Sequence, residues 1–163
     1  MSEPLTKIYI DLPNHFATGG ESIWAAQVGA NSYELRNVPF HAYDLNYLDV
    51  VEAIAVSPDR KPSVRRVVRR SGHRTLRVMF VETTAIADRV PLLESLKGLG
   101  ASFEGATKSL FALDVEPAGD YRAVCERLGS WQSEGILDFE TCEARIAGSF
   151  DDAPAASGTD GAA

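Results

Sequence analysis

The chain has few of the residues that form disulfides or hold metal ions. Its 163 residues include only two cysteines and three histidines. Cys125 and Cys142 are too far apart for a CxxC zinc site and too few for a disulfide framework. His15, His41 and His73 show no close ligand spacing, so we predict no metal site. Because no phosphate-binding glycine motif occurs either, we predict no cofactor.

Long apolar runs are also absent. No run approaches the ~20 residues that a membrane-spanning helix needs. The N-terminus lacks the basic segment and apolar core that are typical of a signal peptide. The composition, 45% hydrophobic and 24% charged, is that of a globular protein with a sizeable core. We therefore expect a cytoplasmic protein that does not contact a membrane.

The spacing of apolar residues predicts an α+β protein. The N-terminal half, residues 1–72, is β-rich, with strands expected over 7–11, 22–28, 32–38, 49–56 and 63–70. Residues 73–146 predict the order β-α-β-β-α-β, the split βαβ pattern of ferredoxin-like folds. In this half Pro91 is expected in the first turn of one helix, and Asp120 is expected to cap the other.

The N-terminal strands are expected to extend or cap the ferredoxin-like sheet, or to close into a small barrel. Both halves would then form one compact unit. Residues 147–163 predict a disordered acidic tail, because the stretch from Asp151 onward has no large apolar side chain to bury.

Acids are missing from one segment of an acidic chain. The segment from Arg60 to Arg77 contains eight basic residues and no acid, although the chain has a net charge of −7, so the rest carries 8 − 23 = −15. The turn Ser71-Gly72-His73 lies between two predicted strands of this segment. We therefore predict a basic β-hairpin.

The arginines of the first strand of this hairpin are expected on both of its faces. Regular alternation would point Arg65 and Arg69 to one face of the strand and place two further arginines, Arg66 and Arg70, on the other. The valines between them alternate imperfectly, which also allows a bulge.

Two interpretations of the basic segment remain open. Its arginines could pair with acids such as Glu34, Asp49 and Glu52 across the strands. They could instead form a face that binds an acidic protein, a phosphorylated ligand or nucleic acid, since arginine forks suit carboxylate and phosphate. The acidic balance of the whole chain argues against general binding to nucleic acid.

Three motifs follow one another along the chain. They are Asn-Val-Pro-Phe-His-Ala-Tyr from Asn37, Leu-Asp-Val-Val-Glu-Ala from Leu48, and Val-Val-Arg-Arg-Ser-Gly-His-Arg-Thr-Leu-Arg-Val from Val67. This series resembles a bacterial domain-of-unknown-function family, the one numbered 4265, and the likeness includes Trp24 and the run Ala-Leu-Asp-Val from Ala112. The resemblance implies a small soluble bacterial domain and brings no activity. Leu48 stands where we expect glycine, so the turn there is expected to be built differently.

Two segments are candidates for a site. Phe40, His41 and Tyr43 could line a ligand pocket together with Asn37, or could form a shaped turn whose aromatic rings fill the core. His73 lies two residues from Ser71 in a turn, which does not suit a nucleophile and its base.

Three functions are therefore considered. The first is a non-catalytic binding or regulatory module for a protein partner or a small anionic ligand. The second is a nucleic-acid-binding accessory protein that uses the basic hairpin. The third is an enzyme with a pocket between residues 37–43 and His73. The candidate binding residues are Arg65, Arg66, Arg69, Arg70, His73, Asn37, Phe40 and Tyr43.

Overall fold

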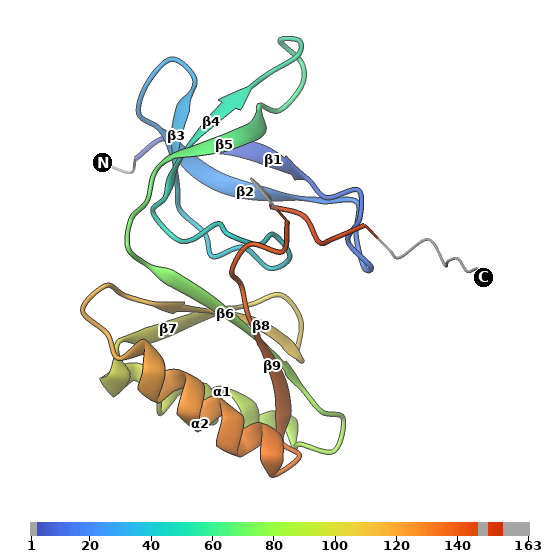
Figure 1. The fold of residues 1–163 in the computed structure, drawn as a ribbon, viewed down its shortest axis with the longest axis vertical. Helices are drawn as coiled ribbons and strands as arrows, with labels where there is room; N and C mark the ends of the chain where they lie inside the picture. The colour runs from blue at the N-terminus through green and yellow to red at the C-terminus, as the bar shows by residue number, and fades with distance from the viewer. Residues whose placement is uncertain (1–2, 147–149, 155–163) are drawn as a thin grey trace, which may run out of the picture.

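The computed structural model of the chain describes residues 3–146 and 150–154. These residues form three layers, with a small barrel at one end, a four-stranded sheet in the middle and two helices on the far side of the sheet (Figure 1). Within the described ranges, no helix is both long enough and apolar enough to cross a membrane.

The first half of the chain forms the barrel. Its strands are β1 (Thr6–Asp11), β2 (Gly20–Gln27), β3 (Ser32–Leu35), β4 (Val50–Ile54) and β5 (Ser63–Arg69). Neighbouring strands are antiparallel, except that β5 closes on β1 in parallel at Tyr9 and Ser63. The interior is filled mainly by aliphatic side chains from alternate strand positions, among them Ile8, Ile10, Ile23, Leu35 and Val51. The β-rich first half therefore has a core of its own and does not extend the second sheet.

The second half forms the sheet and its helices. The elements are β6 (Arg74–Phe80), α1 (Ile86–Glu94), the 3-10 turn η1 (Lys97–Leu99), β7 (Ala101–Gly105), β8 (Leu110–Val115), α2 (Tyr121–Ser133) and β9 (Leu137–Thr141). The sheet is antiparallel in the order β7-β8-β6-β9. Both helices pack on one face, over a second core that includes Leu76, Val78, Leu113, Leu128 and Trp131. The prediction of an α+β protein is confirmed.

The two helices differ in how well their ends could be foreseen. Asp120 caps α2 as predicted, since its carboxylate accepts a hydrogen bond of 3.0 Å from the Ala123 N–H. Helix α1 begins earlier than expected, and Pro91 lies inside it instead of in its first turn. In the structure, Ile86 and Val90 in this first part are 58% and 40% exposed, so they add little to the core beneath the helix.

The predicted basic hairpin is wrong. Strand β5 pairs with β4 and β1, whereas β6 pairs with β8 and β9, so the turn Ser71-Gly72-His73 connects the barrel to the sheet. Gly72 takes the positive φ of 91° that this connection needs. The start of this connection is held by the buried carboxylate of Asp49, which accepts hydrogen bonds from the N–H groups of Ser71 at 2.8 Å and Asn46 at 3.0 Å.

Part of the predicted tail is packed against the barrel. Phe150 contacts the barrel core, and its carbonyl accepts a 2.8 Å hydrogen bond from the Tyr43 N–H. Asp151 is buried and accepts from the Asn14 N–H at 2.8 Å. The tail prediction is therefore wrong for these two residues, because one phenylalanine supplies the apolar surface that the composition after it lacks. Residues 147–149 and 155–163 lie outside the described residues.

Leu48 occupies the turn position at which the sequence motif suggested glycine. Its φ is 67°, in the left-handed region that residues other than glycine seldom adopt. We expect Leu48→Gly to raise the free energy of unfolding by about 1 kcal/mol, because glycine removes the strain of this conformation. Chemical denaturation measures the change. Asp44→Gly is the control: Asp44 has a φ of 63° but also pairs with Arg70 at 2.8 Å, so this variant should gain nothing. A loss of stability in Leu48→Gly would contradict the prediction.

Candidate functional site

One face of the second sheet is turned toward the barrel. Alternation along β6 puts Thr75, Arg77 and Met79 on this face, opposite the helices. The strand register places Leu110 and Asp138 beside Met79 on either side. Thr75 and Arg77 are buried beneath the barrel, whereas Met79 is 46% exposed. The contact between barrel and sheet is therefore closed at one end and open at the other.

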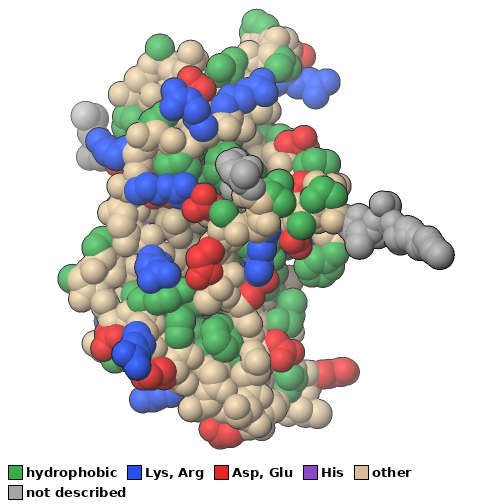
Figure 2. All heavy atoms as spheres, in the orientation of Figure 1, with side chains coloured by type: hydrophobic (Ala, Val, Ile, Leu, Met, Phe, Trp, Pro, Cys, Tyr) green, Lys and Arg blue, Asp and Glu red, His purple; other side chains and the backbone are tan. Residues whose placement is uncertain are grey.

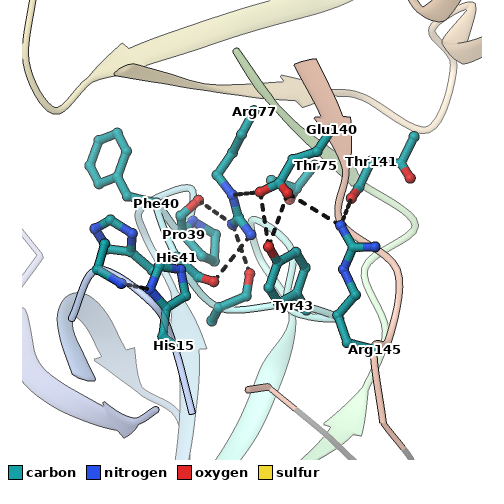
Figure 3. A network of polar contacts seen from close by, with 12 residues as sticks. His15, Pro39, Phe40, His41, Tyr43, Thr75, Arg77, Glu140, Thr141 and Arg145 are labelled. Atoms are coloured by element: carbon teal, nitrogen blue, oxygen red, sulfur yellow. Dashed lines mark hydrogen bonds and ion pairs between the residues drawn. The ribbon is translucent and has the colours of Figure 1, made fainter. Parts of the chain in front are cut away.

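Arg77 holds the closed end together. Its guanidinium is 3% exposed and donates from Nε to Glu140 at 3.0 Å. It also donates from Nη1 to the Ala42 carbonyl at 2.7 Å and from Nη2 to the His41 carbonyl at 3.1 Å. Figure 3 shows it inserted between the loop of residues 37–43 and β9. A single side chain of the sheet thus satisfies several backbone carbonyls of the barrel, which fixes the two halves against each other.

Glu140 accepts hydrogen bonds from the other donors of this network. It accepts from the Tyr43 hydroxyl at 2.9 Å and from Arg145 Nη2 at 3.2 Å, in addition to Arg77 (Figure 3). Burial, together with the negative charge of Glu140, raises the pKa of Tyr43. Burial also raises the pKa of the neighbouring Cys142 thiol to about 12. At neutral pH these two groups are therefore protonated, and Tyr43 acts as a hydrogen-bond donor.

Two carboxylates, one from the barrel and one from the sheet, also bind the loop of residues 37–43. Glu21, on β2, accepts hydrogen bonds of 2.8 to 2.9 Å from the three backbone N–H groups of residues 40–42. Glu104, on β7, accepts from the Val38 N–H at 3.1 Å and from Asn37 Nδ2 at 3.4 Å. Burial raises the pKa of Glu104. The loop is thus anchored to both halves of the molecule.

A cavity of about 320 Å³ occupies the open end. The barrel side contributes His15 and Phe16, from the connection between β1 and β2, and Phe40 and His41, from the anchored loop. The sheet side contributes Met79, Leu110 and Asp138. The ring of Phe16 is 88% exposed, so a large apolar side chain stands at the entrance. Concave, mainly apolar walls with a few polar groups are typical of small-molecule sites.

The two histidines present hydrogen-bonding atoms to this cavity. Their rings meet edge to face at 4.9 Å, and His15 also stacks on Phe16. His15 Nδ1 accepts from the Ala17 N–H at 3.0 Å, so a neutral His15 ring carries its hydrogen on Nε2. Burial lowers the pKa of His41, so this ring is neutral at pH 7. Among the described residues no hydrogen bond reaches the ring nitrogens of His41, which leaves them available to a ligand.

The structure separates the loop residues predicted for the site. Phe40 lines the cavity, whereas Asn37 and Tyr43 hold the loop in place. The prediction that His73 faces the same pocket is wrong, because the link that carries it runs along the closed end. There its Nδ1 lies 2.9 Å from the carboxylate of Asp114. Burial raises the pKa of Asp114, and its hydrogen bond with His73 opposes that shift.

The four candidate arginines on β5 and directly after it are all exposed. The sequence left open regular alternation or a bulge in this strand, and the structure has the irregular form. Strand β5 has register shifts against β4 between Val50 and Val51 and between Glu52 and Ala53. Each irregularity breaks the alternation of side chains. In the space-filling view, basic side chains gather over the barrel with acidic ones among them (Figure 2). The exposed set is Arg65, Arg66, Arg69 and Arg70.

Three of these arginines have acidic neighbours. Arg66 lies 3.4 Å from Glu52, Arg69 lies 3.5 Å from Glu34, and Arg70 lies 2.8 Å from Asp44. Within residues 3–146 and 150–154, Arg65 has no ion pair, and no group of three His, Cys, Asp or Glu side chains could hold a metal ion. The strand therefore carries both of the features that the sequence allowed, namely ion pairs and an exposed basic face.

Comparison with known proteins identifies the family. The model of a domain of unknown function, DUF4265, matches residues 21–139. The chain belongs to this family. The resemblance of the three motifs is thereby confirmed, and the structure shows what DUF4265 motifs do in this chain: Arg77 of the third binds carbonyls of the first, and Asp49 of the second binds Ser71 of the third. No curated protein matches the chain.

A solved structure shares the fold of this DUF4265 protein. It is a hypothetical protein from Neisseria gonorrhoeae, 12% identical in sequence, with a TM-score of 0.72. The match covers 88% of this chain and 97% of that one. The arrangement of barrel, sheet and helices thus also occurs in a protein of very different sequence, and the likeness extends to the fold alone.

Proposed function

We propose that this DUF4265 protein is a non-catalytic binding module whose cavity between barrel and sheet takes a small organic molecule with an apolar body. The observation that carries the proposal is the cavity itself. It combines exposed apolar side chains, Phe16 and Met79, with the unpaired ring nitrogens of His41. Exposed apolar surface next to unused hydrogen-bonding atoms favours a ligand that covers both.

The rigidity of the walls supports binding. Arg77 and Glu21 each bond to several backbone groups of the loop that carries Phe40 and His41. A site held by buried polar contacts loses little conformational entropy when a ligand arrives.

Two residues that line the cavity, Arg77 and Glu140, and two that neighbour them, Tyr43 and Cys142, also favour holding a ligand over reacting with it. Arg77 and Glu140 are bonded to each other, and Tyr43 and Cys142 are protonated at neutral pH because their pKa values are raised. A nucleophile needs a base within hydrogen-bond reach, and no described side chain supplies one to Cys142.

We also infer that the second half is a ferredoxin-like split βαβ unit. The element order β-α-β-β-α-β and the strand order β7-β8-β6-β9 support this assignment. Such a fold hosts many functions, so the cavity and not the fold supports the proposed function.

A titration with 1-naphthalenemethanol tests the proposed function. We expect a dissociation constant of about 0.1 to 1 mM, as suits a ligand of this size. Met79→Trp fills the open end of the cavity and should weaken binding at least tenfold, measured by isothermal titration calorimetry. Val56→Trp adds the same ring at an exposed barrel position and should leave binding unchanged. Equal affinity in the two variants would refute the proposal, and so would a failure of this alcohol and of its cationic and anionic analogues to bind at millimolar concentrations.

A further inference from the structure

The charge that remains at the open end of the cavity is negative. Asp138 is exposed and lies beside Met79 in the register of β9 and β6, so its carboxylate belongs to the floor of the cavity. Among the residues that the structure describes, it forms no ion pair or hydrogen bond. Glu140, two residues further along the same strand, differs because its oxygens already accept from Arg77, Tyr43 and Arg145.

The guanidinium of Arg77, a positive charge beside the cavity, is already paired. Arg77 is 3% exposed and donates to Glu140 and to carbonyls of the anchored loop. Its charge is matched by that of Glu140, 3.0 Å away. Burial lowers the pKa of His41, so this ring adds no charge to the cavity at neutral pH. An anionic ligand would therefore meet the carboxylate of Asp138 without gaining a cation in return.

The apolar walls also suit a cation. Phe16 and Phe40 bring aromatic rings to the cavity, and the faces of such rings attract ammonium groups. A protonated amine has three hydrogen atoms to donate and accepts none. The carboxylate of Asp138 and a ring nitrogen of neutral His41 are acceptors that no described residue uses.

We propose that the ligand of this cavity is an organic cation, a compact apolar or aromatic body that carries a protonated amine. The amine pairs with Asp138, and the apolar body packs against Phe16, Phe40 and Met79. This inference rests on the proposed function, because it assigns a ligand class to the same cavity. It replaces the small anionic ligand that the basic segment suggested, since Arg65, Arg66, Arg69 and Arg70 lie on the barrel surface. Arg77, the one arginine of that segment among the residues that line the cavity, is already paired with Glu140.

Three naphthalene probes of nearly equal size test the charge preference. They are 1-naphthylmethylamine, which is cationic at pH 7, 1-naphthalenemethanol, which is neutral, and 1-naphthoate, which is anionic. In calorimetric titrations at pH 7 and low salt, we expect the amine to bind at least tenfold more tightly than the alcohol, and 1-naphthoate to bind most weakly.

Variants of the carboxylate locate the effect. Asp138→Asn should weaken binding of the amine at least fivefold and leave binding of the alcohol unchanged, because only the amine uses the charge. Asp138→Ser, which also removes the charge, should do the same. The matched control is Asp88→Asn on α1, behind the sheet, which changes the net charge equally and should affect neither probe. Thermal denaturation of each variant checks that the fold is kept.

The outcomes separate the two proposals. Equal binding of amine and alcohol, tighter binding of 1-naphthoate, or an amine affinity that Asp138→Asn leaves unchanged would overturn the organic cation and leave the binding module standing. Failure of all three probes to bind would overturn the binding module, and the organic cation with it.

Discussion

Replacing Arg77 with methionine is expected to lower the free energy of unfolding by about 2 to 3 kcal/mol, less than for a fully buried ion pair because the Glu140 side chain is 39% exposed. The variant keeps much of the side-chain volume but leaves Glu140 without its closest cation. It also removes the donors to the carbonyls of Pro39, His41 and Ala42, of which Ala42 is fully buried. Buried acceptors that lose a donor are costly, because water cannot replace it. Chemical denaturation measures the change.

The matched control for this variant is Arg66→Met on β5. Arg66 also pairs with an acid, at 3.4 Å from Glu52, but its side chain is 65% exposed. Exposed pairs of this kind contribute about 0 to 1 kcal/mol. Arg77→Lys supplies an intermediate test in case the methionine variant does not fold, since lysine keeps the charge but cannot reach all the acceptors of the planar fork. If the Arg77 variants were no less stable than Arg66→Met, the interface would not depend on this arginine.

The sequence allowed good prediction wherever the determining contacts are local. Alternation of apolar residues located the strands of both halves, and Asp120 marked the start of α2 because an N-cap acts on its own helix. The same local signals misled at the turn Ser71-Gly72-His73. A glycine with positive φ between two strands is typical of a hairpin, yet here it joins two sheets. Strand partners depend on contacts far along the chain, such as the one from Asp49 to Ser71.

The cavity was only partly predictable for the same reason. Phe40 was a candidate because its segment is dense in unusual residues, but His15, Met79 and Asp138 come from separate elements with no motif of their own. One signal was available. The predicted split βαβ order pairs the strands that contain Arg77 and Glu140, and would have brought these opposite charges together. The bulges of β5 have only a weak signal, the irregular spacing of its valines, which does not say where the arginines end up.

The close contact between Gly100, which follows η1, and Gly119, which precedes α2, gives the second large effect. Gly100→Ala is expected to cost about 2 to 4 kcal/mol, within the range of backbone-strain mutations. Gly100 has a φ of 85°, and a Cβ there would stand 2.6 Å from the Gly119 Cα, which is backbone and cannot move aside. Its carbonyl accepts from the Glu116 N–H at 3.0 Å, just before the capped start of α2.

Gly98→Ala is the control for this substitution, because it makes the same chemical change two residues away. A Cβ at Gly98 meets nothing within 4 Å, and its φ is not in the left-handed region. Alanine should therefore be neutral there, or stabilising by about 0.4 to 1 kcal/mol through the unfolded chain. In chemical denaturation, the midpoint of Gly100→Ala should lie well below that of the parent protein, and the midpoint of Gly98→Ala should lie at or above it. Equal midpoints would mean that α2 and η1 can shift to admit a methyl group, and that the close backbone contact at Gly119 does not hold this end of the sheet's helical layer.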